Sequence, residues 1–127
     1  MAAAYLDGSL GRDHFWVIDE ADADGGGPVA VAYYAPERMT NGTWNLYLIA
    51  VHPDRRGEGR GAHLLRYVEQ ALTARNERLL LVETSGLPSF ERTRAFYRKC
   101  GYAEEARIRD FYNAGEDKII YRRALTA

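Results

Sequence analysis

The segment that decides the fold is VHPDRRGEGRGA, residues Val51–Ala62. It follows a strand-like run and opens a helical pattern, and it is rich in two residue types: Gly57, Gly59 and Gly61, and Arg55, Arg56 and Arg60. Glycines let main-chain N–H groups approach a ligand closely. The first N–H groups of a helix lack internal partners and carry partial positive charge. The segment therefore predicts an anion site suited to a pyrophosphate.

Other phosphate motifs do not fit this segment. A Walker motif needs Gly-Lys-Ser/Thr after its second glycine, and no such triplet is present. A dinucleotide fingerprint needs glycine three residues after Gly59, where Ala62 stands. A glycine-rich surface loop without a ligand is the alternative that the motif alone leaves open.

The run before the turn, Trp44–Val51, predicts a strand. Alternation places two sets of side chains on opposite faces: Leu46, Leu48 and Ala50, and Tyr47, Ile49 and Val51. Both sets are largely apolar, so we expect a central strand that is buried on both faces.

After the turn, the pattern of the segment from Gly59 to Arg75 predicts a helix, because Leu64, Val68 and Leu72 recur at helical spacing. The apolar run Leu79–Glu83 then predicts a second buried strand. A strand, a helix and a strand in this order predict a parallel pair at the centre of a sheet.

The C-terminal third predicts one more helix and two strands. Phe90–Lys99 has helical spacing, and Gly101 is placed to end the helix in a left-handed turn. We expect the closing strands at Tyr102–Arg109 and Lys118–Arg123, with a polar loop over Asp110–Asp117 between them.

The N-terminal third predicts a hairpin. Its strands are His14–Asp19 and Pro28–Tyr34, and its flexible tip is Ala21–Gly27. A second turn is expected at Thr40–Thr43, where Asn-Gly favours positive φ. Ala2–Gly8 leaves room for one short helix before the hairpin.

Composition limits the class of protein. A chain of 127 residues with 46% apolar residues fits a single domain over residues 1–127. A net charge of −1 gives no reason to expect a nucleic-acid partner. One cysteine, Cys100, excludes an internal disulfide and does not suggest a zinc site. No apolar run is long enough for a membrane span, so we expect a soluble, cytoplasmic protein.

Two spaced motifs resemble the GNAT acetyltransferase superfamily. Arg56–Gly61 matches its Arg/Gln-x-x-Gly-x-Gly/Ala motif, with Val51-His-Pro53 just upstream. Ala95–Tyr102, AFYRKCGY, matches its Phe-Tyr-x-Lys-x-Gly-Phe/Tyr motif. The resemblance covers Pro28–Arg123. It implies an α/β fold of the mixed α+β kind: a mostly antiparallel sheet with a central parallel β-α-β unit and helices packed on it.

The resemblance also implies acetyl-CoA as the acetyl donor and no metal. The pyrophosphate would be held by N–H groups of the turn, which are Arg56, Gly57, Glu58, Gly59, Arg60, Gly61 and Ala62. The backbone of Ile49, Ala50 and Val51 would pair with the pantetheine arm like an added strand. The oxyanion donor would be a backbone N–H near Ala50.

The resemblance assigns Tyr97 to the family tyrosine near the coenzyme sulfur, where its phenol would protonate the leaving thiolate. From its pattern alone, Tyr97 is better explained as a core aromatic residue of an amphipathic helix, and the resemblance reverses that preference. Glu83 is the candidate base, because it ends the strand after the first helix, where a cleft opens. Its alternative role is a salt-bridge partner. Asn45 stands where many relatives have an acid, and it cannot be a base.

Other side chains are weaker candidates for the site. His52 is a second candidate base, and a structural role in the turn is the alternative. Cys100 ends a helix and lacks a supporting base, which argues against an acetyl-cysteine intermediate. Tyr47, Tyr112 and Asp110 are candidates for shaping the acceptor pocket.

The chain also departs from the family pattern. Phe90 stands where many members have asparagine, Thr93 stands where alanine is common, and a strand and two helices usually precede the first hairpin. The shortened N-terminus leaves the acceptor site open or completed by a partner chain, and a homodimer would cover the free sheet edge.

The predicted function is therefore direct transfer of acetyl from acetyl-CoA to a primary amine that the sequence does not identify. An acyl-CoA-binding sensor without catalysis is the main alternative. A protein-interaction module without a ligand is another.

Overall fold

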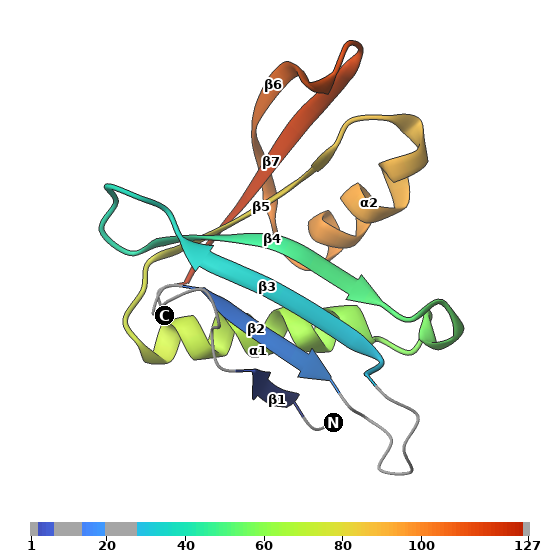
Figure 1. Ribbon diagram of the computed structural model, residues 1–127. Helices are drawn as coiled ribbons and strands as arrows, with labels where there is room; N and C mark the ends of the chain where they lie inside the picture. The colour runs from blue at the N-terminus through green and yellow to red at the C-terminus, as the bar shows by residue number, and fades with distance from the viewer. Residues whose placement is uncertain (1–2, 7–13, 20–27, 126–127) are drawn as a thin grey trace.

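The computed structural model describes residues 3–6, 14–19 and 28–125. The predicted hairpin tip, Ala21–Gly27, lies outside the described residues. The strands are β1 (Ala3–Leu6), β2 (Phe15–Asp19), β3 (Ala30–Pro36), β4 (Thr43–Val51), β5 (Leu79–Ser85), β6 (Ala103–Asn113) and β7 (Glu116–Ala124). The helices are α1 (Arg60–Ala74) and α2 (Glu91–Lys99), with short 3-10 turns at Pro53–Arg55 and Pro88–Phe90 (Figure 1).

The strands form one sheet of seven in the order β1-β2-β3-β4-β5-β7-β6. The pair β4–β5 is parallel, and the other neighbouring pairs are antiparallel. Helix α1 connects the two parallel strands. The predicted mixed, mostly antiparallel sheet with a central parallel β-α-β unit is confirmed.

The two parallel strands separate partway along their length. Thr43–Leu46 of β4 pairs with Leu79–Val82 of β5. Beyond this, β4 continues to Val51 and β5 to Ser85 without pairing to each other. Figure 1 shows β4 and β5 diverging, with α2 beside the opening. The segment Tyr47–Val51 therefore has a free backbone edge on the side of β5.

A β-bulge at Tyr47 changes which side chains of β4 face the core. Leu46 is opposite Tyr34, whereas Leu48 is opposite Tyr33, so Tyr47 is the extra residue. Leu46 is 2% exposed and Leu48 is 42% exposed. The expectation that Leu46, Leu48 and Ala50 share a face was wrong, because the bulge shifts the alternation by one residue. Beyond it, Ile49 and Val51 pack against the core. The strand is central, but only its first half is buried.

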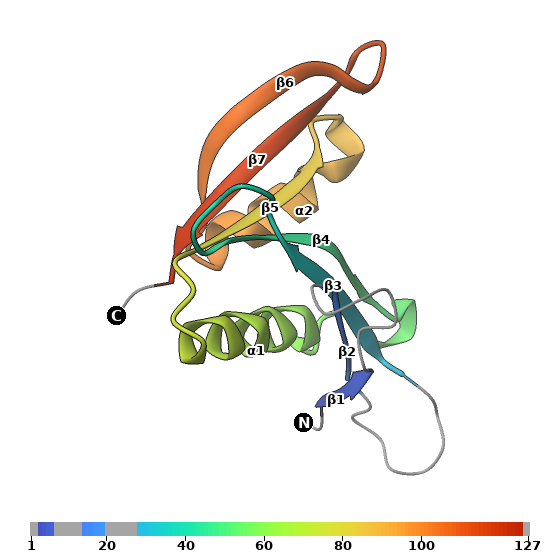
Figure 2. The ribbon, with the colours of Figure 1, turned by 60° about the vertical axis from the view of Figure 1, so that its left-hand side comes forward.

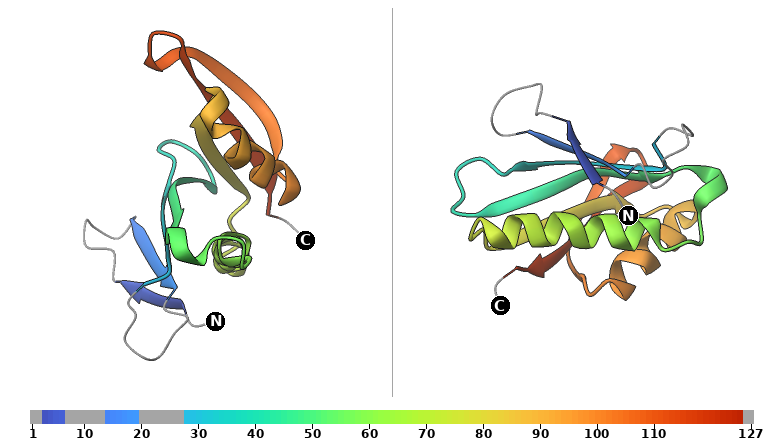
Figure 3. Two further views of the ribbon diagram at one scale, coloured as in Figure 1. Left: turned by 90° about the vertical axis from the view of Figure 1, so that its right-hand side faces the viewer. Right: turned by 90° about the horizontal axis from the view of Figure 1, so that it is seen from below.

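Both helices lie on the same face of the sheet. Helix α1 packs on β3 and β4 through its apolar stripe, which is Leu64, Leu65, Val68 and Leu72. Figures 2 and 3 show it running beneath these strands. Helix α2 adds Tyr97 to the same core cluster, together with Ile119 and Tyr121 of β7. The opposite face of the sheet carries no helix in the part of the chain that the structure describes.

Two expectations at the ends of the chain were wrong. Ala3–Leu6 is a strand paired with β2, not a short helix, because β2 offers a free edge for hydrogen bonding. The predicted loop Asp110–Asp117 is mostly strand, because β6 and β7 extend to a tight turn at Gly115, where φ is +80°. The strands of an exposed hairpin need no apolar alternation. The polar sequence of Asp110–Asp117 therefore did not reveal that both predicted strands extend toward the turn.

Gly101 has φ of +94° and ends α2 as expected. No helix of the described residues is long and apolar enough to cross a membrane.

The bulge predicts unequal effects of two leucine truncations in β4. Leu46→Ala should lower the free energy of unfolding by about 2–5 kcal/mol, because it leaves a cavity in the core. Leu48→Ala should lower it by less than about 1 kcal/mol, because the side chain is largely exposed. Urea denaturation of both variants measures the difference. Equal losses would show that the two leucines share the buried face after all.

Candidate functional site

The turn between β4 and α1 presents backbone N–H groups to solvent. Gly57 and Gly59 have φ of +83° and +77°, and Gly59 caps α1 without a side-chain hydrogen bond. The first N–H donated within the helix comes from His63, which bonds the Gly59 carbonyl at 3.0 Å. The amides of residues 60–62 therefore have no acceptor within α1. Unpaired N–H groups thus lie at the turn where the sequence predicts an anion site.

Arginines of the turn are held by Glu58. Arg55 Nε donates to both Glu58 oxygens at 3.0 Å, and Arg60 Nε donates to Oε1 at 3.2 Å. Hydrogen bonds from Arg55 and then from Arg60 lower the pKa of the Glu58 carboxyl. Arg60 also lies 3.9 Å from the buried Asp19 carboxylate. A bound pyrophosphate would compete with Glu58 for these two guanidinium groups.

The three glycines of the turn have different surroundings. A Cβ on Gly61 would lie 3.4 Å from Phe96 of α2 and 3.5 Å from Val51, which is ordinary van der Waals contact, so packing does not require glycine there. A Cβ on Gly57 or Gly59 would meet nothing within 4 Å. These two glycines supply the left-handed backbone and leave open space before the N–H groups.

The free edge of β4 runs from this turn to the point where the strands separate. His52 N–H donates to the Val29 carbonyl of the neighbouring segment at 2.7 Å. Because amides alternate along a paired antiparallel strand, Ala50 directs its N–H toward β3. Ile49 and Val51 direct their N–H and C=O groups toward the free edge. A ligand could extend the sheet along these two residues.

Glu83 lies where β4 and β5 separate, one residue beyond the last paired residue of β5, Val82. Its carboxylate accepts a hydrogen bond from Asn45 Nδ2 at 2.9 Å and forms an ion pair with Lys118 Nζ at 3.2 Å. Asn45 Nδ2 also donates to Glu37 Oε1 at 3.1 Å. These four side chains form a polar cluster on the face opposite the helices. Glu83 is thus a salt-bridge partner of Lys118, and it also lies at the opening between β4 and β5.

Tyr97 lies on the other side of the sheet, on the inner face of α2. It is 4% exposed, and its ring packs against Phe96, Tyr102 and Tyr121 with centroids 5.4 to 6.0 Å apart. Burial, and then the Cys100 thiol, raise the pKa of Tyr97 well above its usual range. The raised pKa keeps the phenol in its protonated form at neutral pH.

Tyr112 of β6 lies near both candidate residues. Its phenol contributes to the raised pKa of Tyr97. Burial, followed by the Glu83 carboxylate, raises the pKa of Tyr112 itself. The Tyr112 phenol is thus within electrostatic reach of Tyr97 and of Glu83. Asp110, in contrast, accepts a hydrogen bond from Gly115 N–H and belongs to the hairpin turn.

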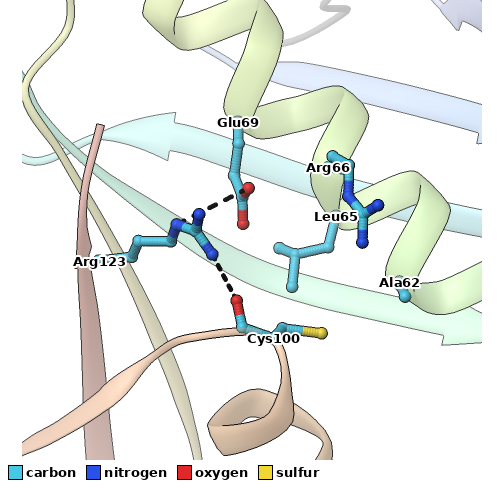
Figure 4. A pocket seen from close by; sticks show the side chains of 6 residues that line it. All are labelled: Ala62, Leu65, Arg66, Glu69, Cys100 and Arg123. Atoms are coloured by element: carbon cyan, nitrogen blue, oxygen red, sulfur yellow. Dashed lines mark hydrogen bonds and ion pairs between the residues drawn. The ribbon is translucent and has the colours of Figure 1, made fainter. Parts of the chain in front are cut away.

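His52 caps a turn, and Cys100 lies in the wall of a pocket. His52 Nδ1 accepts a hydrogen bond from Asp54 N–H at 3.1 Å and caps the 3-10 turn. Cys100 lines a pocket of about 180 Å³ between α1 and the end of α2, together with Ala62, Leu65, Arg66, Glu69 and Arg123 (Figure 4).

Ion pairs and hydrogen bonds hold the walls of this pocket. Arg123 Nη1 donates to the Cys100 carbonyl at 2.5 Å, and Arg123 Nε lies 3.9 Å from Glu69 Oε1. Burial, and then the Glu69 carboxylate, raise the pKa of the Cys100 thiol. A raised pKa disfavours the thiolate, which argues against Cys100 as a nucleophile.

Sequence analysis missed two members of the polar cluster. Glu37 lies in the turn after β3, and Lys118 lies in the last strand, far from Glu83 along the chain. No local pattern links them, because strand pairing alone brings them together. Asn45 was considered only as a missing base, yet it connects the two carboxylates. Within residues 3–6, 14–19 and 28–125, no three His, Cys, Asp or Glu side chains gather as a metal site would require.

Comparison with protein-family models matches residues 11–104 to the acetyltransferase (GNAT) domain. None of the curated proteins matches the chain. Among solved structures, a protein of the GNAT family from Desulfovibrio desulfuricans, named as an acetyltransferase, is 40% identical with a TM-score of 0.83. The alignment covers 89% of this chain and 69% of that one.

Two more distant structures share the fold. The ribosomal-protein-S18-alanine N-acetyltransferase from Escherichia coli is 24% identical over 97% of this chain and 70% of its own, with a TM-score of 0.71. An aminoglycoside 6'-N-acetyltransferase complexed with coenzyme A is 16% identical over 91% of this chain and 75% of its own, with a TM-score of 0.75.

The open space at Gly59 predicts a loss of ligand binding in Gly59→Ala. The added Cβ would point to the space before the helix N-terminus, and left-handed backbone costs alanine about 1–2 kcal/mol. Coenzyme A affinity, measured by calorimetry, should fall by about tenfold or more, a change of about 1.4 kcal/mol.

Gly115→Ala is the matched control. Gly115 has φ of +80° and equally open surroundings, but it lies in the turn between β6 and β7. Both variants should lose similar stability, and only Gly59→Ala should lose coenzyme A affinity. If the two variants bind coenzyme A equally well, the turn is not the pyrophosphate site.

Proposed function

The chain belongs to the GNAT acetyltransferase family, and from this premise we propose that it transfers acetyl from acetyl-CoA directly to a primary amine. The observation that carries the proposal is the free edge of β4. This edge leads from an anion site at the start of α1 to the Glu83 carboxylate, where β4 and β5 separate. One extended donor could therefore bind with its phosphates in the turn and its thioester near Glu83.

The donor would be held by main-chain groups and arginines. The N–H groups of Arg56–Ala62 and the guanidinium groups released from Glu58 would bind the pyrophosphate. The amides of the pantetheine arm would pair with Val51 and with the Ile49 carbonyl as an added strand, which leaves the Ile49 N–H for the thioester oxygen. Ala50 lies between these two residues and keeps the strand paired to β3. Binding along a preformed edge orders the donor without rearranging the sheet.

The acceptor would approach from the face that carries no described helix. The Glu83 carboxylate lies 3.2 Å from Lys118 Nζ and would accept a proton from the acceptor ammonium, directly or through water. Asn45 holds the carboxylate in place. Donor and acceptor thus meet at the opening from opposite faces of the sheet, which supplies proximity without a covalent enzyme intermediate.

The reaction then balances in one ternary complex. The ammonium loses a proton to Glu83, and the freed nitrogen lone pair attacks the thioester carbonyl carbon. The Ile49 N–H, which faces the free edge, stabilises the developing oxyanion. The nitrogen releases its second proton to water, the carbon–sulfur bond breaks, and Tyr97 donates its phenolic proton to the departing thiolate. Solvent restores the proton to Tyr97 and removes one from Glu83. The products are the acetamide and coenzyme A.

The family does not fix the acceptor. The names of two structural relatives specify an alanine of a ribosomal protein and an aminoglycoside. Both are primary amines, but they differ greatly in size and charge. The experiment that tests the proposal is thiol release from acetyl-CoA over a panel of primary amines. Saturable coenzyme binding with no amine-dependent thiol release would instead indicate the acyl-CoA-binding sensor.

Glu83→Gln should lower kcat by about 100-fold, because the amide cannot accept the ammonium proton. Coenzyme A affinity should be retained, since Glu83 lies away from the phosphate turn. The comparison variant is Glu91→Gln, which removes an exposed carboxylate of α2 and should leave kcat unchanged. Stopped assays with the best amine of the panel measure both. An unaltered kcat in Glu83→Gln would assign Glu83 a structural salt bridge only.

Tyr97→Phe should also lower kcat by about 100-fold with little change in coenzyme A affinity. Since the pKa of Tyr97 is raised, its phenol stays protonated, and wild-type kcat should not decline up to about pH 10. Tyr102→Phe is the control. Tyr102 is also buried, but its phenol donates its hydrogen bond to Glu69 of α1. If kcat survives in Tyr97→Phe, solvent protonates the thiolate.

A further inference from the structure

The face of the sheet opposite the helices carries a continuous row of aromatic side chains. Trp16 of β2 stacks on Tyr33 of β3 with ring centroids 4.6 Å apart. Tyr33 contacts Tyr47 of β4 with centroids 5.8 Å apart. We call these three residues the aromatic row. The row crosses three neighbouring strands and ends at β4, the strand with the free edge.

The row leads directly to two carboxylates. Tyr47 OH donates to Glu37 Oε1 at 2.9 Å. The same oxygen accepts a hydrogen bond from Asn45, which also donates to Glu83. Glu37 and Glu83, the carboxylate pair, are therefore held in one network at the end of the aromatic row. Along the face, the order is aromatic row, Glu37 and Glu83.

The charges of this network are unbalanced. Lys118 pairs with Glu83 at 3.2 Å, and no ion pair is found for Glu37 among the described residues. Tyr47 stays a neutral donor to Glu37, because burial and this hydrogen bond raise its pKa to about 12. One carboxylate thus lies beside aromatic rings without a cation. Aromatic faces and carboxylates attract cations together.

We propose that the acceptor carries a second cationic nitrogen, which binds between Glu37 and the aromatic row while the reacting amine lies at Glu83. This inference rests on the proposed function and names its substrate class, an alkyl diamine or a larger polyamine. Each carboxylate would then face one nitrogen of the acceptor.

Other acceptor classes fit the face less well. A simple alkylamine would leave Glu37 without a cation. An amino acid would bring its own carboxylate toward the carboxylate pair, where like charges repel. A neutral aromatic amine could stack on the row but would not use Glu37. The second nitrogen is the feature that uses both the aromatic row and Glu37.

Thiol release with three acceptors of equal length tests the proposal: butane-1,4-diamine, butylamine and 4-aminobutanoate. The kcat/KM for the diamine should exceed that for butylamine by about tenfold, within the range expected for a desolvated cation–π contact. The value for 4-aminobutanoate should be the lowest. A diamine no better than butylamine, in an enzyme that acetylates both, would overturn the inference and leave the proposed function intact.

Two variants of Tyr33 locate the second site. Tyr33→Leu removes the central ring, so the ratio of diamine to butylamine kcat/KM should fall toward one. Tyr33→Phe keeps the ring and loses the hydroxyl contact to His14, so the ratio should be kept. An unchanged ratio in Tyr33→Leu would place the second nitrogen elsewhere and contradict the assignment.

A binding measurement on the unmodified protein decides the inference even without turnover. Trp44 is buried, so a change of tryptophan fluorescence on addition of a small solute reports Trp16. Tetramethylammonium should alter the fluorescence saturably, whereas its neutral analogue tert-butanol and benzyl alcohol should not. Equal effects of the cation and the neutral compounds would show a general apolar surface and overturn the proposal. Absence of thiol release with every amine would instead refute the proposed function.

Discussion

The β-bulge at Tyr47 bends β4 at the residue where its pairing with β5 ends. Four residues of β4, Thr43–Leu46, are paired to β5, and the five residues from Tyr47 to Val51 continue without pairing to β5. Without this separation, the backbone of Ile49 and Val51 would be bonded to β5, and Glu83 would lie within a closed sheet. The extra residue lies where the opening begins, and Ile49, Val51 and Glu83 lie beside it.

The opening divides the chemistry between two faces. On the helix side lie the glycine turn, with its unpaired N–H groups, and Tyr97, whose burial keeps the phenol protonated. On the other side lie Glu83, Asn45 and the aromatic row. Buried apolar packing supports the first face, and hydrogen bonds between side chains support the second. A donor bound from one side and an amine bound from the other can therefore react without displacing each other.

Sequence patterns predicted the parts of the fold that are locally encoded. The glycine turn, the helical spacing of Leu64 and Val68, and the left-handed end of α2 at Gly101 all come from neighbouring residues. The faces of β4 could not be predicted, because a bulge depends on pairing with Tyr33 and Tyr34 of another strand. The length of β6 was missed because its side chains are exposed throughout. The approach of Glu37 and Lys118 to Glu83 depends on sheet order, which no local pattern records.

The central claim is that a donor binds along the free edge of β4, and amide hydrogen exchange at single residues tests it most directly. Saturating acetyl-CoA should slow exchange at Ile49 and Val51, whose N–H groups face the opening. Exchange at Ala50 should change little, because its N–H is already directed to β3. Protection of Ala50 alone, or no protection at Ile49 and Val51 under saturation, would contradict the claim.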